Sequence, residues 1–169
     1  MNITELTHKE NQLSKKVLEL YNQRQTTEKE EKLQNIFDAY RQVHQQYAEQ
    51  AEKDNEALKR GLFIQWYALV EPNHLTGIND IDEQAEEKII QILNQKIENN
   101  ELDDELDWML NYYMRKDWVF DRFNGYKGIV KTMANKNYNL PESIDNISMA
   151  KRGQMGMYWN SLTRFEAKE

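Results

Sequence analysis

Apolar side chains recur every three or four residues through a long stretch in the first half of the chain. They stand at Leu33, Ile36, Phe37, Tyr40, Val43, Tyr47, Ala51, Leu58, Leu62, Trp66 and Leu69. Because this spacing puts them on one helix face, it predicts one long helix, or two nearly continuous ones, from about Glu28 to Val70. Around residues 48–57 that face holds only alanines. We expect a bend there, in a part that is either weakly buried or packed closely against a neighbour.

The end of this segment is far more apolar than the rest of the chain. Residues 62–70 contain one polar side chain, Gln65, and a helix that is apolar all round is normally surrounded by other elements. We therefore expect the helix to end in the middle of the molecule, with Gln65 buried and hydrogen-bonded. Pro72 disfavours helical geometry at the residue before it and should end the helix. Leu75 and Ile78 should then fold the following loop back onto the core.

The same helical spacing continues on both sides of this segment. Two Pro and six Gly in the whole chain leave little material for the many tight turns of an all-β protein. Further helices are predicted through residues 13–21, 82–97, 104–123 and 144–165, with a short one near Ile129; the expected caps are Thr26 or Thr27 and Asp80 or Asp82. The predicted fold is all-α, a single-domain helical bundle over residues 1–169. It has about five or six helices built around one long central helix.

The composition is that of a folded chain. Only 39% of the residues are hydrophobic and 30% are charged, but four Trp, nine Tyr and five Phe argue against disorder. The chain has no Cys, which excludes disulfides and thiolate metal sites. Its first residues lack the apolar core of a signal peptide, and no apolar run is long enough to cross a bilayer. We expect a soluble cytoplasmic protein that makes no contact with membranes.

Negative charge is concentrated in one segment. The chain has a formal net charge of −7, and residues 80–107 hold eleven acids against only Lys88 and Lys96. Such a field repels nucleic acid and attracts a basic protein partner. The alternative is that these acids merely occupy two helix N-termini and a solvated surface, where the helix dipole favours them.

One aromatic side chain falls among polar ones. If residues 104–123 form one helix, a polar stripe runs along it through Asp104, Asp107, Asn111, Arg115 and Arg122, and Trp118 lies on that stripe. An exposed Trp beside acids is typical of a protein-binding hot spot. Alternatively, the helix breaks near Lys116 and Trp118 turns inward, or the last helix covers it. The predicted partner-binding residues are Glu86, Glu87, Asp103, Asp104, Asp107, Arg115 and Trp118.

Evidence for catalysis or metal binding is thin. A di-iron carboxylate bundle needs two Glu-x-x-His units among its helices, and the chain has two, at Glu5–His8 and Glu71–His74. A proline interrupts the second unit, and the first lies near the N-terminus. His44, on the apolar face of the long helix, is interpreted as a hydrogen-bonded core residue. We predict no catalytic residue, no metal ligand and no cofactor, because phosphate-binding loops and nucleophile elbows are also missing.

A small basic segment near the C-terminus contains Gly153 and Gly156. Their spacing permits close approach of another helix, and it equally permits a kink or break, because each Gly costs about 1 kcal/mol in a helix. The apolar spacing of this segment favours packing against the core over binding to a membrane.

The main hypothesis is a non-enzymatic, acidic helical module that binds a basic protein partner, as immunity or inhibitor proteins do. It binds no nucleic acid and no membrane. One alternative is a helical-bundle enzyme that binds a metal or small ligand through Glu5, His8, Glu71, His74 or His44. Another is a structural homo-oligomer in which the Leu33–Ala51 stripe pairs with its copy in a second chain.

Overall fold

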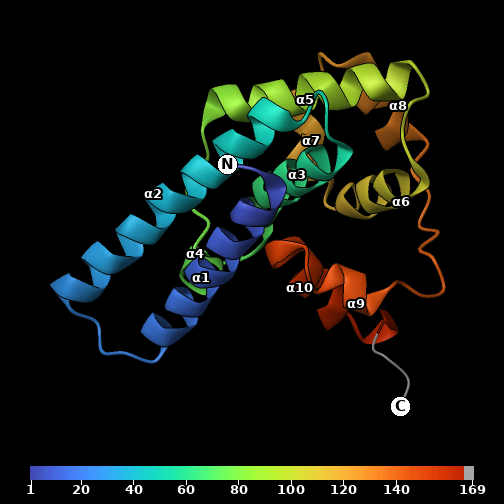
Figure 1. The fold of residues 1–169 in the computed structure, drawn as a ribbon. Coiled ribbons are helices and arrows are strands. Elements are labelled where there is room, and N and C mark those ends of the chain that lie inside the picture. The colour runs from blue at the N-terminus through green and yellow to red at the C-terminus, as the bar shows by residue number, and fades with distance from the viewer. Residues whose placement is uncertain (166–169) are drawn as a thin grey trace.

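The computed structural model describes residues 1–165, and every regular element in that range is helical (Figure 1), which confirms the all-α class. In chain order the elements are α1 (Ile3–Tyr21), α2 (Thr27–Gln50), α3 (Asn55–Val70), α4 (Asn73–Thr76), α5 (Glu83–Glu98), α6 (Asp104–Tyr113), α7 (Asp117–Phe120), the 3-10 helix η1 (Asp121–Phe123), α8 (Lys127–Ala134), α9 (Asn146–Met149), α10 (Gly153–Ser161) and the 3-10 helix η2 (Thr163–Phe165).

The described residues thus form ten α-helices where five or six were predicted. Turns divide three of the predicted segments, which produces the four-residue helices α7 and α9, and α4, also of four residues, forms in the predicted loop after Pro72. None of these helices has the length and apolar content needed to cross a membrane.

The predicted long helix is divided at residues 51–54, inside the expected bend. Asp54 adopts an extended conformation and caps α3, because its carboxylate accepts hydrogen bonds from the backbone of Glu56 and Ala57. Ala48, Ala51 and Ala57 are at most 2% exposed. The expectation of close packing is therefore confirmed, and that of weak burial is wrong, since small side chains let α2 and α3 approach each other.

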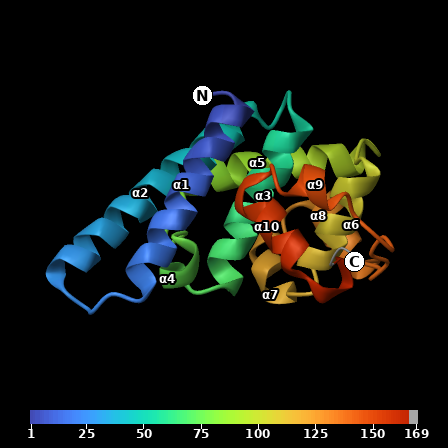
Figure 2. The same ribbon diagram turned by 60° about the horizontal axis from the view of Figure 1, so that its bottom comes forward.

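The helices α1 and α2 form a hairpin whose closed end projects from the molecule (Figures 1 and 2). Elsewhere along the hairpin, α1 contacts α4 and α10, and α2 contacts α3 and α5. Thr26 caps α2 by accepting a hydrogen bond from Lys29, as predicted. The apolar stripe of α2 is used within the chain, because Ile36, Tyr40 and Val43 are buried where α1 and α3 pack on this helix.

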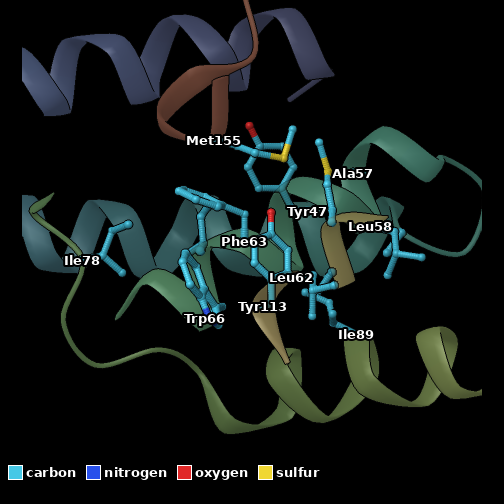
Figure 3. Close-up of a cluster of buried hydrophobic side chains, with 14 of the residues drawn as sticks. Tyr47, Ala57, Leu58, Leu62, Phe63, Trp66, Ile78, Ile89, Tyr113 and Met155 are labelled. Atoms are coloured by element: carbon cyan, nitrogen blue, oxygen red, sulfur yellow. The ribbon is translucent and has the colours of Figure 1, made fainter. Parts of the chain in front are cut away.

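The centre of the molecule is α3 rather than one long helix. Its buried Leu62, Phe63 and Trp66 meet Ile89 of α5 and Tyr113 of α6 in one cluster (Figure 3). The prediction that the apolar run is surrounded therefore holds for its first half.

The second half of that run departs from the prediction. Leu69 is 42% exposed in the last turn of α3, which emerges at the surface before Pro72 ends the helix. Ile78 is buried as expected, but Leu75 is 40% exposed. Gly77, in the left-handed region, turns the chain after α4 so that only Ile78 reaches the core.

The predicted helix over residues 104–123 is also wrong in its second half. Residues four apart share a helix face, but Met114 is fully buried and Trp118 is 55% exposed. The chain instead turns after Tyr113, and α7 starts at Asp117. The turn lets Val119 enter the core while Trp118 stays outside.

The two glycines near the C-terminus both have a conformational role. Gly153 takes a positive φ of 62° at the start of α10, and a Cβ at Gly156 would overlap the carbonyl oxygen of Met149 in α9. The break and the close approach considered as alternatives thus occur together. The predicted last helix is divided there, and Ile147, assigned to its apolar face, is 76% exposed.

Candidate functional site

A groove of about 630 Å³ lies where the end of α3, the beginning of α5, α2 and η1 meet. Ala68, Leu69 and Ile81 form its apolar part. Its charged lining consists of Asp80, Asp82, Glu83, Glu86, Arg41 and Arg122. We call it the α3–α5 groove.

Local sequence fixes the walls of this groove. Asp82 caps α5 by accepting a hydrogen bond of 2.9 Å from the backbone of Ala85, and its other carboxylate oxygen accepts one of 3.1 Å from Gln45 of α2. Arg41, also in α2, donates to the backbone oxygen of Asp80 at 3.2 Å. The loop before α5 is therefore held against α2, with its acids facing the groove.

The electrostatics of the groove are unbalanced. Four carboxylates line it against two guanidinium groups, and Asp80 and Glu83 are exposed and form no ion pair within residues 1–165. The hydrogen bond from the backbone of Ala85 lowers the pKa of Asp82. The groove therefore holds more acids than cations and offers two exposed carboxylates without a cationic partner among residues 1–165, of which Asp80 accepts a hydrogen bond of 3.3 Å from Asn79.

Glu86 differs from the other acids of the groove. Its side chain is only 9% exposed and forms an ion pair with Arg122, whose side chain is 48% exposed. Burial raises the pKa of Glu86, and the charge of Arg122 acts in the opposite direction. The next residue, Glu87, lies on the exposed side of α5 and accepts a hydrogen bond from the hydroxyl of Tyr126.

The predicted acids near α6 lie apart from this groove. Asp103 caps α6 by accepting a hydrogen bond of 2.7 Å from Leu106 and forms an ion pair with Lys59 at 2.9 Å. Asp104 and Asp107 line a second hollow of about 420 Å³.

These two groups of acids are about 20 Å apart along the axis of α5, given a rise of about 1.5 Å per residue. The structure therefore divides the predicted acidic surface into two separate areas, one at each end of α5 (Figure 1). Sequence proximity alone had grouped them.

The predicted cation and aromatic residue have distinct environments. The guanidinium of Arg115 lies 4.8 Å from the ring centre of Tyr112 and 4.9 Å from that of Tyr138, so it is held between two rings. Trp118 precedes Arg122 by four residues across the helical run of α7 and η1. Because η1 is a 3-10 helix, this spacing does not fix the two side chains on one face. Trp118 is 55% exposed and is not among the residues that line the groove.

The residues considered for metal binding do not assemble. No group of three or more His, Cys, Asp or Glu side chains within the described chain is arranged to hold a metal ion. Glu5 instead completes a capping box at the start of α1, His8 contacts Gln12, and His74 stacks on Tyr21.

His44 is a core residue, as the sequence indicated. It is fully buried and hydrogen-bonded to Gln65 at 3.2 Å, so the expected partner of Gln65 is now known. Burial lowers the pKa of His44 to about 4, because the protein interior disfavours the charged imidazolium.

The buried carboxylate of Glu10 in α1 was not predicted from the sequence. Glu10 is 1% exposed and accepts a hydrogen bond of 2.7 Å from the hydroxyl of Tyr47. Arg60 donates to the same hydroxyl at 3.3 Å but forms its ion pair with Glu56. Burial raises the pKa of Glu10 to about 7. The signal available was its position in the helical spacing, because Glu10 lies between Leu6 and Leu13 on the apolar face.

A second interior cluster fastens the start of α10. Arg152 binds Glu56 of α3 at 2.8 Å and Glu105 of α6 at 2.9 Å. Lys59 lies 2.9 Å from both Asp103 and Glu105. Asp103 and Glu105 thus hold helices together through the chain's own cations, while 38% of the Asp103 side chain and 32% of the Glu105 side chain remain exposed.

Comparison of the chain with protein-family models, curated proteins and solved structures found no match in any of the three. The α3–α5 groove and its surroundings are therefore the features from which a function can be inferred.

Proposed function

We propose that the protein is a non-enzymatic, acidic helical module that binds a basic partner protein, in the manner of an inhibitor or immunity protein. The observation that supports this most directly is the α3–α5 groove, in which the exposed carboxylates of Asp80 and Glu83 lie beside an apolar strip. The absence of Cys fits action in a reducing compartment such as the cytoplasm.

The chemistry of the groove favours a basic segment with an apolar side chain. Leu69 is 42% exposed beside Ile81, so burying it would be favourable for a partner. Asp80 and Glu83 supply carboxylates for Lys or Arg at the rim, where charge complementarity speeds association and selects partners. The exposed Trp118 of α7, the helix directly before η1, supplies an aromatic side chain of the kind that dominates binding energies.

Affinity capture from the lysate of the source organism, read by mass spectrometry, tests this function. One bait is wild type, a second has Asp80→Asn, Glu83→Gln and Trp118→Ala, and a control has Asp104→Asn and Asp107→Asn. We expect wild type and control to retain a basic protein that the groove variant loses. The purified protein should then bind wild type directly, and more weakly as salt rises from about 0.05 to about 0.5 M, because salt screens exposed charges.

Identical capture by all three baits would contradict a role for the groove. Direct binding that is insensitive to salt would contradict recognition by charge.

A further inference from the structure

The ion pair between Glu86 and Arg122 points to the side chain that the groove selects. We propose that Arg122 occupies, in the free protein, the place that an arginine of the partner takes in the complex. This inference rests on the proposed function and names the chemistry of the partner, an arginine-bearing segment.

The first observation is the unequal exposure of the two side chains. Glu86 is almost completely buried, whereas Arg122 is about half exposed and reaches Glu86 from the groove. The cation is therefore the outer half of the pair and is accessible to replacement. The carboxylate is the fixed half, held within α5.

The second observation is that Glu86 is the groove acid that most needs a cation beside its carboxylate. Asp82 is already satisfied by the backbone of Ala85 and by Gln45. Asp80 and Glu83 are exposed, so water solvates them. A buried carboxylate such as Glu86 needs a cation, since leaving it unpaired is strongly unfavourable.

Exchange of one guanidinium for another meets this need throughout binding. The incoming arginine keeps Glu86 paired, while Arg122 retains a second favourable contact, with its guanidinium carbon 4.7 Å from the ring centre of Phe123. A guanidinium is planar and weakly hydrated, so it suits a nearly buried carboxylate better than the strongly hydrated ammonium of lysine. The groove should therefore prefer arginine to lysine.

Removal of Arg122 provides the test, with an arginine hexapeptide and a lysine hexapeptide as probes in titration calorimetry. Arg122→Ala should bind the arginine peptide about tenfold more tightly than wild type, because the competing side chain is gone, and should gain less for the lysine peptide. Arg122→Gln should show the same order. The double variant Glu86→Gln, Arg122→Ala should lose the gain.

The groove offers a matched control in Arg41→Ala. It changes the net charge by the same amount and removes the other guanidinium of the groove lining, whose hydrogen bond goes to the backbone oxygen of Asp80 and not to a carboxylate. Its gain therefore measures the general effect of charge, and only the excess in Arg122→Ala reports on the place beside Glu86. Circular dichroism and urea unfolding confirm that each variant is folded.

The outcomes separate the two proposals. If Arg122→Ala gains no more than Arg41→Ala, or gains equally for both peptides, or keeps its gain without the Glu86 carboxylate, the inference about Arg122 is wrong. The proposed function survives that result if wild type binds the peptides and Asp80→Asn with Glu83→Gln weakens binding. If wild type and all variants bind neither peptide, the groove does not recognise basic segments and both proposals fail.

Discussion

Burial shifts the pKa values of two residues, Glu10 and His44, toward their neutral forms, and their effects on stability have opposite signs. Burial raises the pKa of Glu10 from 4.5 to about 7, so the folded protein binds this proton more tightly than the unfolded chain. Its contribution to the free energy of unfolding is complete below pH 4.5 and declines by about 3 kcal/mol as pH rises to about 7. Burial lowers the pKa of His44 from 6.5 to about 4, so its contribution is complete above pH 6.5 and declines as pH falls to about 4.

Single variants should uncover these two opposing trends, which nearly cancel in wild type. In Glu10→Gln, only the His44 trend remains, so the free energy of unfolding should rise by about 2 kcal/mol from about pH 5 to about pH 7 relative to wild type. In His44→Gln, which retains a partner for Gln65, it should fall by a similar amount. Urea unfolding monitored at several pH values measures both differences.

The paired design supplies its own control, because each variant removes one trend and leaves the other in place. Parallel pH profiles for wild type and Glu10→Gln would show that Glu10 titrates in the folded protein as it does in the unfolded chain.

At the scale of helices, the packing of α9 against α10 depends on the missing side chain of Gly156. Gly156→Ala should lower the free energy of unfolding by more than about 2 kcal/mol, because the new Cβ would overlap a backbone oxygen that cannot move alone. Gly125→Ala is the matched control. No atom lies within 4 Å of the Cβ position at Gly125, so a change within about 0.5 kcal/mol is expected.

Urea unfolding of the two variants measures the comparison. Equal stabilities of Gly156→Ala and Gly125→Ala would mean that α9 and α10 are not in close contact in solution.

Sequence predicted the helices whose boundaries are set by nearby residues. Thr26 and Asp82 cap helices through hydrogen bonds to residues three positions away, and Pro72 acts on its immediate neighbour. The break before α7 was an alternative that the sequence could not decide, because both sides of it have helical spacing. Only the packing of Met114 and Val119 against distant helices favours a turn over a continuous helix.

The groove escaped prediction for a related reason. Arg41, Leu69, Glu86 and Arg122 come from four elements, and no local pattern indicates that these elements meet. The acids of residues 80–107 could not be distinguished by sequence alone. In the structure, Glu86 differs from the exposed acids because it is buried, and Asp103 differs because it caps α6. Trp118 is exposed, which was one of the alternatives left open, but the turn after Tyr113 exposes it and not the continuous helix on which that spacing was based.

At the scale of the whole molecule, the hairpin of α1 and α2 is tied to the remaining helices by buried polar contacts. Gln154 of α10 donates to the hydroxyl of Tyr40 and to the backbone oxygen of Thr76, and Arg60 of α3 donates to the hydroxyl of Tyr47 in α2. We therefore predict that the chain unfolds as a single domain. Thermal unfolding followed by tryptophan fluorescence and by far-UV circular dichroism should give coincident transitions.

All four Trp lie outside α1 and α2, and Trp66 and Trp159 are buried in the core. Tryptophan fluorescence therefore reports on the helices outside the hairpin. A helical signal that is lost before the fluorescence changes would show that the hairpin melts separately.

The contact between α1 and α10, which lie far apart in the sequence, also affects how the protein is made (Figure 2). Glu10 is synthesised well before Gly153 and Gln154, which pack against it. Until then the carboxylate of Glu10 remains hydrated and the apolar face of α1 lacks part of its cover. The core around Glu10 can therefore be completed only after α10 has been synthesised.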